Sequence, residues 1–419
     1  MASITIEEPT EIREPGRVEI WGAIALALAF VAITRLPFAR LVPMETDERM
    51  FVQHIGETWF PIHHTLFQAA GRLLSLATGD AYRGLVLLDM LVSGLALASV
   101  WWWLRALVRP STALAATAVV AAAPVFWSLG EMAGNYTMIP LVGSFLLGVA
   151  VRGWREPRAW HPYASAVVLA VGTGYREDLG TFWLPVLGVI LWKQRWRPAI
   201  LALGLFTVLN LGWLLPMLSD VGGLAEYRRQ SAEFAQSAGY RNSIWYLGFY
   251  DAPVRYSVKL GLAMAWTFGP GLLFLPRGLF RVGSTSEGRK LALLLALPIV
   301  PALGSHLLVH FGVAGYSFHY LPAAVALMAI GIGKATATDA SSDMAPARLS
   351  TLAVGLACLF LFYPADFNRP GWRGDFDLAV ARYTRVGLQS EIAERAPNAW
   401  RTRNSIQAAR TSAPSIRAN

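Results

Sequence analysis

Long apolar runs alternate with short polar stretches along most of the chain. Crossing the hydrocarbon core of a bilayer as a helix takes roughly 20 residues, and about eleven runs reach or approach that length. The pattern predicts an all-α, polytopic membrane protein with about 11 transmembrane helices, within a range of about 9–13. The spans are expected at about 18–38, 84–104, 112–130, 137–151, 162–175, 179–192, 199–217, 256–275, 291–309, 319–333 and 350–363.

The segment between the first two expected spans, about 39–83, is too polar to cross a membrane. Its middle, Glu48–Ala77, has the amphipathic pattern of one or two helices that lie in the membrane interface and break near Pro61. Arg35, near the end of the first span, is expected to snorkel to the interface. Residues 1–17 lack the basic start of a cleaved signal peptide, so the first span should remain as an anchor.

The composition is typical of a membrane protein and argues against a soluble or nucleic-acid-binding protein. Of the 419 residues, 55% are hydrophobic and 15% are charged, whereas a soluble domain has about 25% charged residues. A net charge of +9 would suggest nucleic-acid binding in a soluble protein. Here the basic residues lie in short loops between apolar runs, so no nucleic-acid partner is expected. The single cysteine, Cys358, excludes a disulfide within the chain.

The basic residues are distributed unevenly among the loops, which predicts the orientation of the chain. Fourteen of them lie in five connections: Arg105, Arg109, Arg152, Arg155, Arg158, Lys193, Arg195, Arg197, Arg277, Arg281, Arg289, Lys290, Lys334 and Arg348. The alternate loops at 131–136 and 310–318 hold none. The positive-inside rule therefore predicts a cytoplasmic segment at 1–17, a membrane domain at 18–363 and an extracytoplasmic tail at 364–419.

Unusual polar side chains gather on the expected outer side. Ionisable groups at membrane depth are costly and are usually paired or functional, so a shared outward cavity is the economical interpretation. The candidate site residues are Asp47, Glu48, His63, His64, Glu131, Tyr136, Arg176, Glu177, Arg228, Arg229, His319 and Tyr320. Asp89, one turn into the second span, is expected to have a structural partner.

Several short motifs resemble one enzyme superfamily. Thr46–Phe51 (TDERMF) follows the first span and resembles the Asp-Glu motif in the first outer loop of GT-C glycosyltransferases, most nearly the protein O-mannosyltransferase and lipid A aminoarabinose transferase group. His63–Leu66 (HHTL) keeps the His and Leu of that group's His-Pro-Pro-Leu but neither Pro. His319–Pro322 (HYLP) resembles its Arg-Tyr-Leu-Leu-Pro pattern. As an arrangement, the similarity covers roughly residues 18–335.

This resemblance implies a membrane enzyme that transfers a sugar from a polyprenyl-phosphate donor to a lipid, glycan or protein acceptor outside the membrane, here the bacterial inner (cytoplasmic) membrane. It places the catalytic acid-base residue at Asp47. The chemistry needs a base for the acceptor hydroxyl and cations at the departing phosphate. Arg176 and His319 are the first candidates to hold the phosphate, with Arg228 and Arg229 behind them.

The two carboxylates of the motif are expected to have different tasks, because neighbours on a helix point about 100° apart. Asp47 is expected to be the base and Glu48 to have a positioning role. Arg176 could equally pair with a local carboxylate, and His63 and His64 could be plain interfacial residues. A divalent metal between Asp47 and Glu131 is possible as a cofactor, although two carboxylates are few for such a site.

Other functional classes remain open on the sequence alone. A transporter or flippase of a polyprenyl-linked glycan would carry the same long apolar runs. Such proteins often show internal repeats and ionisable groups at mid-membrane. No convincing repeat is present, and the carboxylates other than Asp89 sit at the outer ends of spans, which favours an outward-facing enzyme. A polysaccharide ligase or polymerase is a further alternative.

Overall fold

The computed structural model describes residues 14–36 and 46–337. The expected span at 350–363 and the expected tail at 364–419 lie outside these residues. All regular secondary structure in the described part is helical. The helices include α1 (Arg17–Arg35), α4 (Ala81–Leu104), α5 (Pro110–Ala122), α7 (Met138–Arg155), α8 (Trp160–Tyr175), α9 (Asp178–Trp192), α10 (Trp196–Val221), α13 (Asp251–Phe268), α14 (Leu275–Ser284), α15 (Ser286–Leu308) and α16 (Leu321–Ala337).

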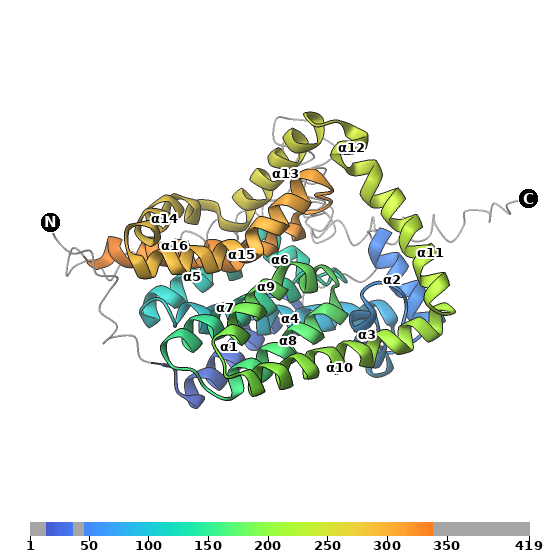
Figure 1. Cartoon of the computed structure of the whole chain (residues 1–419), viewed down its shortest axis with the longest axis horizontal. Helices are drawn as coiled ribbons and strands as arrows, with labels where there is room; N and C mark the ends of the chain where they lie inside the picture. Colours follow the sequence, from blue (N-terminus) through green and yellow to red (C-terminus); the bar gives the residue numbers. More distant parts are fainter. Residues whose placement is uncertain (1–13, 37–45, 338–419) are drawn as a thin grey trace, which may run out of the picture.

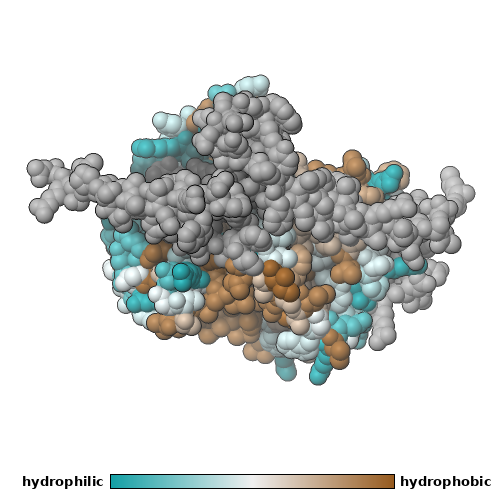
Figure 2. Space-filling view, turned by 180° about the vertical axis from the view of Figure 1, so that it is seen from behind, coloured by the Kyte–Doolittle hydropathy of each residue, from teal (hydrophilic) through white to brown (hydrophobic). Residues whose placement is uncertain are grey.

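Several of these helices have the length and apolarity to cross a membrane. In the described part of the chain they are α1, α4, α10 and α15, with a fifth span if α13 and α14, which meet at 98°, count as one. The helices α5, α9 and α16 are apolar but shorter. Figure 2 shows a broad hydrophobic area across one face, with polar side chains toward its two ends. The expectation of an all-α, multi-pass membrane protein is confirmed.

The expected span at 112–130 is two helices rather than one. It divides into α5 and the short α6 (Pro124–Leu129), because Ala123 is extended, with φ −64° and ψ 127°. Proline suits the first turn of a helix, where its missing N–H has no partner to lose. Pro124 therefore starts α6 as a separate helix.

Helix α4 forms the centre of the bundle. It packs against α1, α7 and α3 (Thr65–Thr78), and most of its apolar length is buried. Aromatic contacts join it to its neighbours: the Trp102 ring stacks on Phe145 of α7 with centroids 5.5 Å apart, and the Trp103 indole N–H donates to the Pro322 carbonyl at 2.9 Å. Such close packing and polar contacts hold helices together where lipid supplies no hydrophobic drive between them.

Polar contacts tie the helices together at both ends of the bundle. At one end, Arg152 on α7 donates to Glu14, ahead of α1, at 2.9 Å and to the Trp102 carbonyl at 2.9 Å. At the other end, Asp220 of α10 accepts from the Thr58 hydroxyl and from the Phe60 amide. These latter contacts fix the loop between α2 (Thr46–Glu57) and α3. The expected pair of amphipathic helices with a break near Pro61 is present.

An arch of short helices joins α10 to α13. It consists of α11 (Leu224–Phe234), a π-helical turn at Ala235–Gly239, a 3₁₀ turn at Tyr240–Asn242 and α12 (Ile244–Leu247). In Figure 1 the arch passes beside α2 and rises to the top of the molecule, where α13 begins. It therefore lies at the same end of the bundle as the α2–α3 loop.

The position expected for Arg35 is wrong. Its side chain does not extend to the interface but is fully buried. It donates to the Ser93 hydroxyl and, at 3.3 Å, to the Phe126 carbonyl, and its guanidinium lies over the Phe126 and Trp127 rings. A buried cation is stable only near opposite charge, and the carboxylates of Asp89 and Glu131 attract it. This attraction holds the arginine inside the bundle.

Candidate active site

Asp47 lies in the first turn of α2, with its side chain exposed. It stands at a small pocket with a volume of about 30 Å³. The pocket is lined by Asp47, Glu48, Phe51, His64, Leu129, Met132, Ala133, Gly134, Asn135, Tyr136 and Val313. A volume of this size has room for about one water molecule, so any larger molecule that reacts with Asp47 must lie at the pocket's mouth.

Glu48 lines the same pocket but, unlike Asp47, is fully buried. Its carboxylate accepts a hydrogen bond from the Tyr82 hydroxyl at 2.7 Å and from the Ala133 amide at 3.2 Å. These contacts join α2 to α4 and to the loop that precedes α7. The geometry gives the two neighbouring carboxylates separate surroundings, as the helical spacing predicts: Asp47 is open to solvent and Glu48 anchors the helix that carries it.

Arg176, in the turn between α8 and α9, forms the centre of a buried polar cluster. It donates to the Asn135 side chain at 2.7 Å and to the Asp178 carboxylate at 3.0 Å. Its guanidinium carbon lies 4.2 Å from the Tyr136 ring centroid and 5.1 Å from that of Tyr316. Burial is the largest single effect and disfavours the positive charge, but Asp178, Tyr136 and Tyr316 together outweigh it and raise the pKa of Arg176. The local Arg–carboxylate pair expected at this turn is therefore present.

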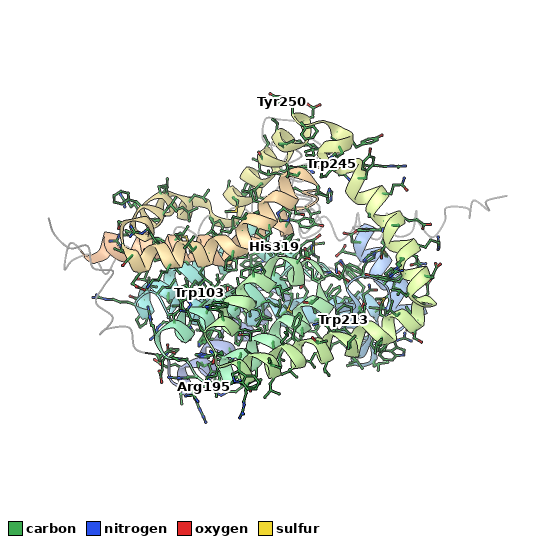
Figure 3. The ribbon with its side chains drawn as sticks, viewed as in Figure 1. Trp103, Arg195, Trp213, Trp245, Tyr250 and His319 are labelled. Carbon is green, nitrogen blue, oxygen red and sulfur yellow. The ribbon has the colours of Figure 1, made fainter. Side chains whose placement is uncertain are left out.

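Asp178 extends the cluster to the loop before α16. Its carboxylate lies 3.2 Å from Nε2 of His319, and His319, near the middle of the molecule in Figure 3, is fully buried. Burial lowers the pKa of His319, and attraction by Asp178 opposes this only partly. Tyr320, the next residue, places its hydroxyl 2.8 Å from Nδ1 of His306 on α15. The structure thus brings three separated segments of sequence, around residues 136, 176 and 319, into one network.

The two histidines before α3 lie in an unusual backbone conformation. Their φ angles are +64° for His63 and +53° for His64, in the left-handed region that residues other than glycine rarely adopt. The His64 amide donates to the Glu177 carboxylate at 2.5 Å, and its Nδ1 lies 3.1 Å from the other oxygen. The His63 ring packs against Phe234 of the arch, with centroids 4.7 Å apart. The loop behind Asp47 is thereby joined to the Arg176 turn.

Charge at this junction is balanced between the loop and the turn. Burial would raise the pKa of the Glu177 carboxyl, but His64 and its hydrogen bonds outweigh burial and lower that pKa to about 2. For His63, burial is the largest effect and lowers the pKa below the usual histidine value. Glu177 therefore stays ionised as the acceptor for His64, while His63 favours its neutral form against Phe234.

The structure does not bring every candidate residue to this network. Glu131 is fully buried and accepts from the Trp127 indole at 2.5 Å, on the side of Arg35. Arg228 and Arg229 are exposed on α11, where Arg229 pairs with Glu226 and Glu233 of its own helix. Asp89 has the structural partner that was expected, since its carboxylate accepts from the Thr137 hydroxyl.

Two members of the network were missed by the sequence reasoning. Asn135 has a φ of +51°, and a Gly-Asn pair in a short outer loop was the available signal, because asparagine tolerates the left-handed region. Tyr316 lies in the other outer loop without basic residues. Within residues 14–36 and 46–337, no three His, Cys, Asp or Glu side chains are grouped as a metal ion would require.

Comparison with known proteins gives likenesses of structure but not of sequence. No protein-family model and no curated protein matches the chain. The crystal structure of ArnT from Cupriavidus metallidurans in the apo state is similar, with a TM-score of 0.53 and 14% identity, over 90% of this chain and 73% of that one. ArnT is a lipid A aminoarabinose transferase of the GT-C type.

A second solved structure is larger than this chain. It is the Archaeoglobus fulgidus oligosaccharyltransferase in complex with Zn and sulfate, similar with a TM-score of 0.47 and 11% identity. The match covers 91% of this chain but 56% of the oligosaccharyltransferase, so this chain spans little more than half its length. The likeness to ArnT confirms the arrangement that the sequence motifs suggested. The chain therefore has a helical membrane-protein fold similar to that of ArnT.

Proposed function

We propose that this protein is an integral-membrane glycosyltransferase that moves a sugar from a polyprenyl-phosphate donor to an acceptor hydroxyl, with Asp47 as the general base. One observation carries the proposal. An exposed carboxylate, Asp47, and a buried cation, Arg176, face the same tyrosine, Tyr136. Transfer from a lipid phosphate needs a proton acceptor and a positive field within one site.

In this reaction the acceptor oxygen attacks the anomeric carbon as its proton passes to Asp47. The bond between that carbon and the phosphate oxygen breaks, and the polyprenyl phosphate leaves with the electron pair. Arg176 attracts the developing negative charge through the Tyr136 ring, and Asn135 and Asp178 hold its guanidinium in place. Glu48 takes no proton and fixes α2 through Tyr82 and Ala133.

The location of the reaction follows from the loop charges. Among the basic residues, Arg152 pairs with Glu14 just ahead of α1, whereas Asp47 follows the other end of α1. The positive-inside rule favours the cytoplasm for the basic end, so the site would open on the extracytoplasmic face of a bacterial inner membrane. The acceptor would be a lipid, glycan or protein presented there. Addition of a chelator to the same assay tests whether transfer needs a divalent metal.

The proposal can be tested with the purified protein in lipid nanodiscs. A panel of polyprenyl-phosphate pentoses and hexoses is supplied with extracted membrane lipids, and free polyprenyl phosphate is measured by mass spectrometry. Asp47→Asn keeps the shape but removes the base, so transfer should fall by at least about 10²-fold. Glu57→Gln is the matched control, since Glu57 is an exposed carboxylate at the other end of α2.

Two results would contradict this function. One is a wild-type rate in folded Asp47→Asn. The other is a wild-type protein that carries the donor lipid between leaflets of proteoliposomes but never releases polyprenyl phosphate. The second result would identify a flippase with the same fold.

A further inference from the structure

At the end of the bundle opposite Asp47, an open pocket lies between the start of α8 and the start of α10. Its volume is about 620 Å³, and its lining is Tyr163, Arg195, Trp196, Arg197, Pro198 and Leu201. Arg195 marks this place in Figure 3, at the lower edge of the molecule and far from His319. We call this the Arg195 pocket. It contains no residue of the Asp47 site.

The Arg195 pocket is cationic. Arg195 and Arg197 are both exposed, and no carboxylate in the described part of the chain pairs with either guanidinium. The Arg197 guanidinium lies 5.2 Å from the Trp196 ring centroid, which orients it beside the pocket. Two guanidinium groups with free hydrogen-bond donors are suited to a phosphate, which they can bind with paired N–H groups.

The pocket continues into an exposed apolar surface on α10. Ile200, Leu201 and Leu203 follow it along α10 and are 59%, 61% and 50% exposed. Trp192 and Trp196 beside the pocket are 87% and 67% exposed. Tryptophan prefers the boundary between headgroups and hydrocarbon. The Arg195 pocket therefore lies at headgroup depth, with an uncovered apolar helix face directly below it.

We propose that the Arg195 pocket binds one anionic phospholipid from the adjacent leaflet. Its phosphate lies on Arg195 and Arg197, and its acyl chains lie along Leu201 and the exposed face of α10. The combination of a phosphate site with a continuous apolar surface selects a lipid over a soluble phosphate. Basic pockets between membrane helices take anionic headgroups by this chemistry. The proposal does not depend on the reaction at Asp47.

The test uses the full chain in a zwitterionic detergent, with phosphatidylglycerol and phosphatidylcholine as probes and native mass spectrometry as the readout. The variant is Arg195→Gln with Arg197→Gln. Its matched control is Arg289→Gln with Lys290→Gln, which removes two positive charges from exposed residues at the start of α15, outside the pocket. A second variant, Arg195→Lys with Arg197→Lys, keeps both positive charges but lacks the planar guanidinium groups. Thermal unfolding checks that all are folded.

We expect wild type to bind phosphatidylglycerol more tightly than phosphatidylcholine. The glutamine pair should weaken phosphatidylglycerol binding by roughly 10- to 30-fold. The control should stay within about threefold of wild type, and the lysine pair should lie between them.

Three results would overturn the proposal. The first is unchanged binding in the folded glutamine variant. The second is an equal loss in the Arg289 and Lys290 control, which would show attraction by overall charge alone. The third is full competition by millimolar glycerol phosphate, which would show a site for soluble anions.

Discussion

The guanidinium of Arg176 lies over the ring of Tyr136, 4.2 Å from its centroid. The ring separates the cation from the pocket at Asp47, because Tyr136 lines that pocket and Arg176 does not. Arg176 keeps its charge although it is deeply buried, because Asp178 and its other neighbours stabilise that charge. This relationship makes the tyrosine part of the site rather than only its wall.

Removal of Arg176 should impair use of the donor. Arg176→Ala deletes a buried charge and leaves Asp178 without its arginine partner, so donor use should weaken by roughly 2–4 kcal/mol, the range for truncating one partner of a buried charged pair. Arg176→Lys should recover only part of this, because lysine lacks the fork that reaches both Asn135 and Asp178. Steady-state kinetics in nanodiscs measures the effect. The control is Arg83→Ala, which removes an exposed arginine at the same end and should leave donor kinetics unchanged. A folded Arg176→Ala variant with normal donor kinetics would show that Arg176 has only a structural role.

Glu48 and Tyr82 should be energetically coupled. Glu48→Ala leaves the Tyr82 hydroxyl and the Ala133 amide without this acceptor, at a cost of roughly 1–3 kcal/mol for each buried group left unsatisfied. Glu48→Gln keeps an acceptor oxygen and should lose much less. A double-mutant cycle with Tyr82→Phe, followed by thermal unfolding in detergent, should give a coupling of roughly 0.5–3 kcal/mol. Strict additivity would show that the hydrogen bond adds nothing to stability.

Gly130 should not tolerate a side chain. A Cβ at this position would lie 2.0 Å from Nη1 of Arg35 and 2.9 Å from the Ser93 hydroxyl. The buried guanidinium, held against Phe126, would have to move, so Gly130→Ala should destabilise the protein by roughly 1–3 kcal/mol. Gly188→Ala on α9 is the control, because nothing lies within 4 Å of its would-be Cβ. Equal melting temperatures for the two variants would show that Arg35 moves aside freely.

The loop before α3 should lose stability in mild acid. Burial lowers the pKa of His63 below the reference value of 6.5. His63 therefore binds a proton more readily in the unfolded chain than in the folded chain. The contribution of neutral His63 is fully present above about pH 6.5 and is lost as the pH falls from there toward the lowered pKa. His63→Asn, which suits the left-handed backbone, should show a smaller fall in melting temperature between pH 7.5 and 5.5. An unchanged fall would assign the acid sensitivity to another group.

The positions of the helices could be predicted from the sequence because apolar runs record what faces lipid or the bundle interior. The amphipathic pair α2 and α3 and the adjacent helices α8 and α9 are where the pattern placed them. The break at Ala123 and the 98° bend between α13 and α14 could not be found in this way. Both depend on a few backbone angles that leave the average hydropathy of the run unchanged.

The site was predicted less completely. The helical repeat alone predicts that Asp47 and Glu48 have different surroundings. In the structure Asp47 is exposed and Glu48 is buried. The contacts of Arg176 with Asn135 and Tyr316 join loops some 40 and 140 residues away in the chain, and no spacing rule encodes such contacts. The position of Arg35 was mispredicted for a related reason. Its place near a span end suggested the interface, whereas buried carboxylates from other parts of the chain attract its charge.

Helix α10 has a consequence for how the bilayer acts on this protein. Its 26 residues extend about 39 Å, more than the roughly 30 Å of hydrocarbon, and its sides are largely uncovered. A helix longer than its membrane adjusts by tilting as the bilayer thins or thickens. Asp220 at its tip holds Thr58 and Phe60, so any tilt displaces the loop that carries His63 and His64. We therefore expect acyl-chain length to influence the loop beside the proposed site.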